Sequence, residues 1–175
     1  MVIDPISEIE CEAIVQAIDV SSDGKWMAWG GEDGTVRILD MSSSPKPIEP
    51  FNVEDSVTHV RFAYGDVIVV GTHTSDVYGH ERLGGRRWTH SVGGGCDLMG
   101  ISNDGTLIAC IDGGRHVHIV TENGVKRGRF SSGELIGLSV ANDGTGIAVN
   151  DDEGHVYVLD SNGNLRWKRS PVQDD

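Results

Sequence analysis

The sequence has few of the features that mark several large classes of protein. It contains only 3 cysteines in 175 residues, and Cys11, Cys96 and Cys110 have neither the even number nor the CxxC spacing of a disulfide framework or a zinc ribbon. No apolar run approaches the roughly 20 residues that a membrane helix needs. The first ten residues lack the basic and apolar regions of a signal peptide. We therefore expect a cytoplasmic protein without membrane contact, whose thiols are reduced and buried.

Basic charge is also scarce. The chain has 14 Lys and Arg against 27 Asp and Glu, which gives a formal net charge of −13. Such a surface repels nucleic acid at long range and attracts basic partners. Because 38% of the residues are hydrophobic, the chain has the composition of a folded globular protein. We expect a protein partner and do not expect nucleic acid.

A helical periodicity is missing as well, and short runs rich in Val and Ile take its place. These runs recur about every forty residues, and Asp-Gly pairs at Asp23, Asp104 and Asp143 mark the same point in three copies. A weaker copy, from about His59, fills the gap between the first two. We expect an N-terminal strand within residues 1–16, a tail at 172–175, and four repeats at about 17–56, 57–95, 96–134 and 135–171.

Each copy has the pattern of four antiparallel strands joined by hairpin turns. In the first copy we expect strands near 17–21, 25–30, 35–40 and 47–53, and in the last near 135–140, 146–150, 155–160 and 164–170. One such sheet cannot bury both of its faces, so successive sheets must stack, and radial stacking gives a β-propeller. The predicted fold is all-β: a β-propeller of about four four-stranded antiparallel blades. These blades could also form half of a larger or dimeric propeller.

Two stretches resemble known propeller repeats. "AWGGEDGTVRILD", from Ala28 to Asp40, is similar to the WD-repeat signature, with Leu39 where that family prefers tryptophan. "LDSNGNLRW", from Leu159 to Trp167, resembles the pyrroloquinoline-quinone-like repeats. In the second family this motif packs blades together, so the resemblance implies architecture and not the quinone. We expect no cofactor.

The N-terminus bears on whether the ring closes. Ser7 to Val15 alternates like one more strand, which would be one strand too many for a closed ring of four blades. Three arrangements remain open: a half-propeller that pairs with itself into an eight-bladed ring, a piece of a larger or partner-completed propeller, and a closed four-bladed monomer. We favour a homo-oligomer or a partner-completed ring.

Metal and phosphate sites are weakly supported. Asp160, Asn162 and Asn164 have the spacing of a calcium loop, but Leu165 stands where that loop needs glycine, so we interpret the segment as a turn. The glycine-rich stretches lack a phosphate-binding motif. His116 and His118 share one face of a predicted strand and could hold a metal, with His155 as a third ligand. Without further ligands at fixed spacing we expect no metal.

The candidate partner-binding residues form three groups. Acidic residues fall in the turns between the second and third strands, which in a propeller share one face: Glu32, Asp33, Asp76, Asp112 and Asp152. Basic residues fall on the outermost strands, where they either prevent edge pairing or bind an acidic partner: Arg86, Arg87, Arg127 and Arg129. Three aromatic residues complete the set: Trp26, Trp29 and Trp88.

No set of residues has the order of a catalytic site, so we predict a non-enzymatic scaffold that presents propeller turns to a protein partner. A small-molecule-binding or enzymatic propeller with its site at the ring centre is the first alternative. A structural subunit of a larger assembly is the second.

Overall fold

The computed structural model describes residues 9–42, 45–74 and 76–171. These residues form sixteen strands in four antiparallel sheets, each with its strands in chain order. That part of the chain contains no helix long and apolar enough to cross a membrane. The strands are β1 (Val15–Val20), β2 (Trp26–Gly31), β3 (Thr35–Asp40), β4 (Lys46–Asn52), β5 (Val57–Phe62), β6 (Val67–Thr72), β7 (Asp76–Glu81), β8 (Arg86–Ser91), β9 (Leu98–Ile101), β10 (Leu107–Asp112), β11 (His116–Thr121), β12 (Lys126–Ser131), β13 (Leu135–Val140), β14 (Gly146–Asp151), β15 (Val156–Asp160) and β16 (Leu165–Arg169).

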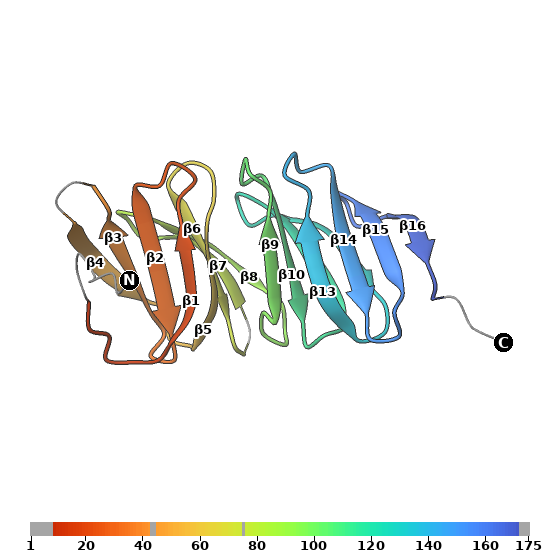
Figure 1. Ribbon diagram of the computed structural model, residues 1–175, viewed down its shortest axis with the longest axis horizontal. Coiled ribbons are helices and arrows are strands. Elements are labelled where there is room, and N and C mark those ends of the chain that lie inside the picture. The colour runs from red at the N-terminus through yellow and green to blue at the C-terminus, as the bar shows by residue number, and fades with distance from the viewer. Residues whose placement is uncertain (1–8, 43–44, 75, 172–175) are drawn as a thin grey trace, which may run out of the picture.

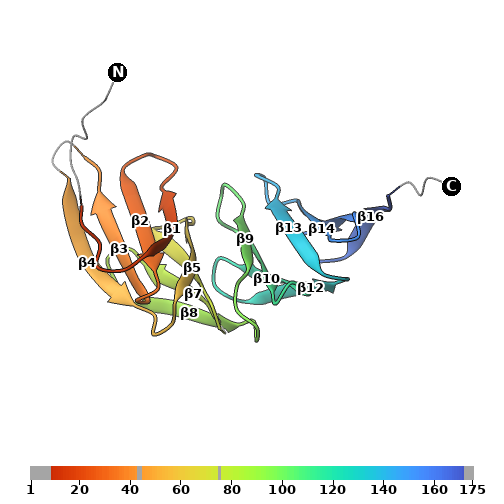
Figure 2. The same ribbon diagram turned by 60° about the horizontal axis from the view of Figure 1, so that its bottom comes forward.

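The four sheets stand side by side in an arc, with the first and last sheets at opposite ends (Figure 1). Viewed from below, the first strand of each sheet lies toward the concave side and the fourth toward the convex side (Figure 2). The molecule is therefore a partial β-propeller, which confirms the predicted fold class. A closed ring of four blades was one of the expected arrangements, and the open arc rules it out for this chain conformation.

Repeated turn chemistry explains why the strands end where they do. After the first strand of the first, third and fourth sheets, an aspartate side chain accepts a hydrogen bond from the backbone N–H two residues on, at 3.1 Å in each case. The glycine that follows each aspartate has φ between 68° and 70°, a conformation that glycine adopts at no steric cost. The Asp-Gly pairs at residues 23, 104 and 143 are thus hairpin turns, as predicted. The observed strands of the first and last sheets begin and end within two residues of their predicted limits.

Three apolar clusters hold neighbouring sheets together. Ala28, Val36 and Ile38 of the first sheet pack with Val60 and Ile68 of the second. A second cluster joins the second and third sheets, and a third cluster joins the third and fourth. Because β6 and β10 are buried along their whole length, the two middle sheets have both faces covered. Stacking thus supplies the burial that a single sheet lacks.

The expected N-terminal strand is not present in residues 9–14, which have no strand assignment, and residues 7–8 lie outside the described part. Val15 already belongs to β1. Residues 9–14 instead lie against the first sheet, where the backbone N–H of Glu32 donates to the carbonyl of Ile14 and the Trp29 indole N–H contacts Cys11 Sγ at 3.2 Å. Residues 9–14 thus lie beside the first sheet without a strand assignment, and Ile9 and Ile14 are exposed. Cys11 is exposed, contrary to the expected burial of all three thiols, whereas Cys96 and Cys110 are buried.

Candidate functional site

The connections along one edge of the arc carry many carboxylates and almost no basic side chains. In each sheet the second strand runs down to this edge in Figure 1. The edge therefore carries the turns between second and third strands and the links from one sheet to the next. Among the described residues of these connections, Arg115 is the one lysine or arginine. The carboxylates are Glu32, Asp33, Glu54, Asp55, Asp97, Glu134, Asp152 and Glu153, joined by Asp76, Asp112 and Asp151 at the adjoining strand ends. We call this set the acidic edge.

The acidic edge contains all five predicted acidic residues, and the structure thus places them on one face, as expected. Glu32 and Asp152 are exposed. Asp76 accepts a hydrogen bond from the Tyr78 hydroxyl at 3.1 Å. The Arg37 guanidinium pairs with Asp33 at 2.7 Å and, with other hydrogen bonds, holds the pKa of that carboxyl below its usual value. The edge therefore combines exposed carboxylates with carboxylates held by neighbouring side chains.

Asp112 has a mainly structural role. Its two carboxylate oxygens lie 2.7 Å from His116 Nδ1 and 2.7 Å from His118 Nε2, and its side chain is 9% exposed. Burial is the main cause of a lowered pKa for His118, although the bond to Asp112 opposes it. Both histidines thus face one side of the strand, as predicted, but they bind a carboxylate of their own sheet.

A similar arrangement recurs in the fourth sheet, where Asp151 accepts hydrogen bonds from the Tyr157 hydroxyl at 2.9 Å and from the backbone N–H of His155 at 2.8 Å. Asp151, Glu153 and His155 each bring one possible ligand atom within 4.8 Å of the others and could hold a metal ion. The hydrogen bonds to Asp151 account for its position without a metal. His155 is not brought together with His116 and His118.

The Asp160 turn has no need of calcium. Its carboxylate accepts hydrogen bonds from the backbone N–H groups of Asn162 and Asn164 at 2.8 and 2.9 Å, and from the Asn164 amide at 2.9 Å. These bonds close the hairpin between β15 and β16. They lower the pKa of Asp160, with the Asn164 side chain as the largest cause. The predicted structural turn is confirmed.

The three tryptophans do not gather at the acidic edge. The Arg82 guanidinium lies 3.6 Å from the ring centroid of Trp26. Trp29 is only 6% exposed. The Trp88 indole N–H donates to the carbonyl of Glu122, at 2.8 Å, in the neighbouring sheet. Trp29 and Trp88 therefore have packing roles, and in this conformation they present little surface to a partner.

The four predicted arginines lie exposed on the convex side, on β8 and β12. Arg86 stacks over the Tyr78 ring at 4.4 Å, and Arg87 Nε lies 3.7 Å from Glu81 Oε1. Arg127 donates to the Asn162 side chain of the next sheet at 3.2 Å. Arg129 lines a shallow groove together with Asp112 and His116. Arg86, Arg87 and Arg127 thus contact residues outside the acidic edge, whereas Arg129 shares this groove with Asp112.

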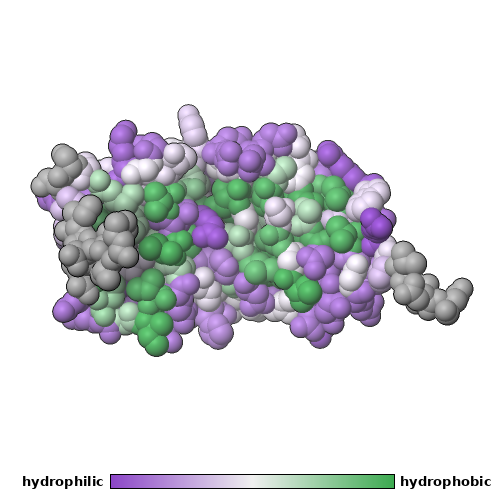
Figure 3. Space-filling model, in the orientation of Figure 1, coloured by the Kyte–Doolittle hydropathy of each residue, from purple (hydrophilic) through white to green (hydrophobic). Residues whose placement is uncertain are grey.

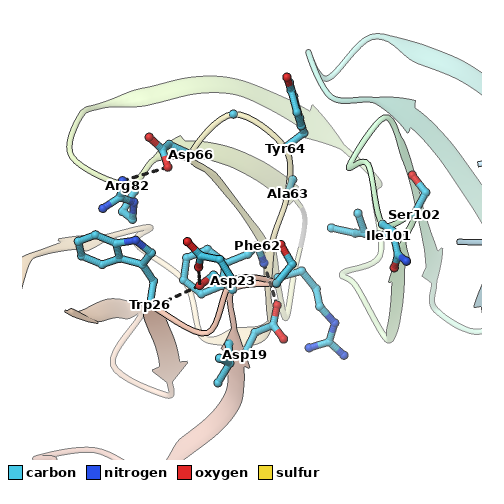
Figure 4. A pocket seen from close by; sticks show the side chains of 16 residues that line it. Asp19, Asp23, Trp26, Phe62, Ala63, Tyr64, Asp66, Arg82, Ile101 and Ser102 are labelled. Carbon is cyan, nitrogen blue, oxygen red and sulfur yellow. Dashed lines mark hydrogen bonds and ion pairs between the residues drawn. The ribbon is translucent and has the colours of Figure 1, made fainter. Parts of the chain in front are cut away.

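A polar pocket of about 480 Å³ lies on the opposite edge, among the turns of the first three sheets (Figure 4). Its charged groups already have partners. Asp66 pairs with Arg82 at 2.9 Å, and the Asp19 carboxylate accepts from the backbone N–H of Phe62 at 2.8 Å. Hydrogen bonds from Ser21 and the backbone of Lys25 lower the pKa of Asp23 to about 2. The bond between Asp19 and Phe62 joins the first two sheets, and the other contacts lie within one sheet.

Sequence reasoning missed the acidic residues that link one sheet to the next, namely Glu54, Asp55, Asp97 and Glu134. A signal was present. When strands alternate in direction, a link between sheets reaches the same edge as the turn between the second and third strands. Following strand direction through all four repeats would have added these residues to the predicted face.

Comparisons with known proteins show the fold alone. No protein-family model matches the chain, and no curated protein matches it. Among solved structures, Sqt1 from Chaetomium thermophilum is similar, with a TM-score of 0.83 and 17% sequence identity over 98% of this chain and 52% of Sqt1. A structure of the same protein bound to the N-terminus of the ribosomal protein L10 has a TM-score of 0.82 at 17% identity, over 98% of this chain and 55% of that one. The chain thus spans about half the length of the solved structures that it matches, which agrees with a partial propeller.

Proposed function

We propose that this partial propeller is a non-catalytic protein-interaction module whose acidic edge binds a basic, extended segment of a partner protein. The main evidence is that this edge is almost entirely acidic. It has eleven carboxylates, and Arg115 is the one lysine or arginine of the described connections. A surface of one sign attracts the opposite charge and raises the rate of association.

A similar structure supports binding of a chain segment. Sqt1 has been crystallised with the N-terminus of a ribosomal protein. A rigid set of blades that presents turns on one edge suits such a role, because the backbone of the turns is fixed before binding and little conformational entropy is lost. We also assign the blades to the WD type, on the resemblance of Ala28–Asp40, and we keep a cytoplasmic location as a prediction.

Fluorescence anisotropy with a labelled lysine-rich peptide tests this proposal. The test variant removes three carboxylates from one part of the edge: E134Q, D152N and E153Q. Asp152 and Glu134 are held together by a hydrogen bond between their backbones, 2.9 Å long. We expect binding that weakens as salt rises, and a further weakening of about tenfold or more in the triple variant.

The matched control removes the same formal charge elsewhere, by E49Q, E81Q and E122Q, on the outer strands and the opposite edge. We expect the control to weaken binding by less than about threefold, since long-range charge is partly screened. Equal weakening by both variants would show that net charge alone attracts the peptide, and the proposal would then be wrong. Failure of the wild-type protein to bind the peptide would also contradict it.

A further inference from the structure

The two ends of the arc expose sheet faces that the interior sheets bury. Ile18 on β1 and Val60 on β5 occupy the same register position, opposite Trp29 and Val70. Val60 is fully buried by the preceding sheet, whereas Ile18 is 56% exposed. Figure 3 shows apolar surface across the middle of the concave side, between polar upper and lower edges. The exposed face of the first sheet is thus built like a blade interface.

Trp88 shows how one interior sheet reaches the next. It lies on β8 opposite Gly79, just after a register shift in the strand pair. Its ring carbon Cδ2 would lie 2.6 Å from a Cβ on Gly124, so only glycine leaves room for it there. With the bond to the Glu122 carbonyl, Trp88 thereby fastens the second sheet to the turn between β11 and β12 of the third.

At the junction between the third and fourth sheets, the register position that Trp88 occupies in the second sheet again contacts the next sheet. Gly128 on β12 pairs with Ile119 at the equivalent point. A Cβ on Gly128 would collide with the carbonyl of Asn162, in the turn between β15 and β16. At both junctions, therefore, this position on the outermost strand contacts the turn between the third and fourth strands of the next sheet.

Trp167 occupies that position in the fourth sheet. It pairs with Val158 beside a register shift, as Trp88 pairs with Gly79. Among the described residues no further sheet covers it, and Trp167 is 50% exposed. An exposed tryptophan at a position that contacts the next sheet in two other repeats indicates an unfilled blade junction.

The outer face of the first sheet, which residues 9–14 partly cover, holds a matching cavity. An apolar pocket of about 350 Å³ lies there, lined by Ile9, Trp29, Leu39, Pro45 and Pro47 among others. Leu39 pairs with Met27 as Val120 pairs with Ile108, and Val120 is a member of the cluster against which Trp88 packs. The pocket is therefore where an indole from a preceding sheet would lie.

The polar parts of the junction also correspond. Ser42 donates its backbone N–H to Asp40 at 2.9 Å, as Asn162 does to Asp160 at 2.8 Å, so the two turns begin alike. Arg166 precedes Trp167 as Arg127 precedes Gly128, and Arg127 binds the Asn162 side chain. Exposed cations on β16 would meet a first sheet that carries Glu49 on its exposed outer strand.

We infer that the exposed end of the fourth sheet docks on the first sheet of a second copy of this chain, with the Trp167 indole in the pocket beside Leu39 and Pro47. The reciprocal contact closes an eight-bladed ring, within the four to eight blades that propellers have. A second copy is the occupant because each chain carries both halves of the junction, one at each end of the arc. The inference uses the ends of the arc and does not depend on the acidic edge.

Light scattering on the eluting chain tests the inference over a range of concentrations. We expect a mass of twice the 18.8 kDa of one chain. W167A should raise the dissociation constant by at least about tenfold, since a buried tryptophan at an interface centre contributes much of the binding energy. The control is Y64A, which removes an aromatic side chain that is 73% exposed and lies on the polar pocket of the opposite edge. It should leave the mass unchanged.

A complementation test separates docking from unfolding. P47W fills the pocket from an exposed position, and we expect this variant to dimerise more weakly as well. An equimolar mixture of W167A and P47W regains one intact junction per pair and should form heterodimers. A wild-type mass of one chain at all concentrations would overturn the inference, as would a dimer insensitive to W167A, a mixture that stays monomeric, or an open series of larger masses.

Discussion

The Nε2 atom of His118 lies 2.7 Å from a carboxylate oxygen of Asp112, between two strands of the third sheet. His116 takes the other oxygen at the same distance. Asp112 thus belongs to the predicted acidic face by position, yet its contacts make it part of the packing within the third sheet.

Replacing Asp112 with Asn should reduce stability. One of the two histidines loses its charged acceptor in a buried setting, which costs about 1–3 kcal/mol in the free energy of unfolding. Urea denaturation followed by circular dichroism measures the difference. The control is D152N, an exposed change on the same edge that should shift stability by less than about 0.5 kcal/mol. Equal effects of the two substitutions would contradict the structural role of Asp112.

His80 should make stability depend on pH. Its ring stacks on Phe51 with centroids 3.9 Å apart, and neither ring nitrogen has a hydrogen-bond partner within the described ranges. Burial, helped by the charge of Arg86, lowers the pKa of His80 from 6.5 to about 4. Between these two pH values the unfolded chain binds a proton that the folded chain does not, so this contribution to stability falls as pH falls.

The expected loss from His80 is on the order of 2–3 kcal/mol between pH 6.5 and 4. H80L should remove that part of the pH dependence, which urea denaturation at a series of pH values would measure. H73L, which changes an exposed histidine, serves as the control and should keep the wild-type slope. A wild-type slope in H80L would show that other groups cause the acid sensitivity.

Gly128 should tolerate no side chain. A Cβ there would collide with the carbonyl of Asn162 in the next sheet, and the backbone turn has little freedom to move away. We expect G128A to lower the free energy of unfolding by about 1–3 kcal/mol, as overpacking does elsewhere. G85A is the matched control, because nothing lies within 4 Å of a Cβ at that position. If G85A destabilised the protein as much, the close approach at Gly128 would not be the cause.

Arg82 should resist replacement by lysine. Its planar guanidinium stacks on Trp26 at 3.6 Å while it pairs with Asp66 at 2.9 Å, and an ammonium group cannot make both contacts in that geometry. We expect R82K to cost about 1 kcal/mol in thermal or urea unfolding. R87K changes an exposed arginine with a 3.7 Å contact to Glu81 and should have little effect. Equal losses would argue against the stacked geometry.

The blades were predictable because their signals are local. Asp23-Gly24 and its two counterparts combine an aspartate that caps the turn with a glycine at positive φ, and such pairs fix strand limits wherever they occur. The path of residues 9–14 was not predictable, since an alternating pattern suits either a ladder or packing on a sheet face. The full extent of the acidic edge was not predictable in the same way. Residues such as Glu54 and Asp55 can be assigned to this edge only when the direction of every strand is known.

Contacts between neighbouring sheets alone hold the arc together, so the protein resembles a short one-dimensional chain of coupled units. In a single copy, without the inferred second one, the end units open more readily than the middle ones, because each has a single neighbour. Amide hydrogens of β6 and β10, buried along their whole length, should exchange most slowly, and those of β16, exposed throughout, should exchange first. Local stability against opening therefore decreases from the two central sheets toward the two ends of the arc.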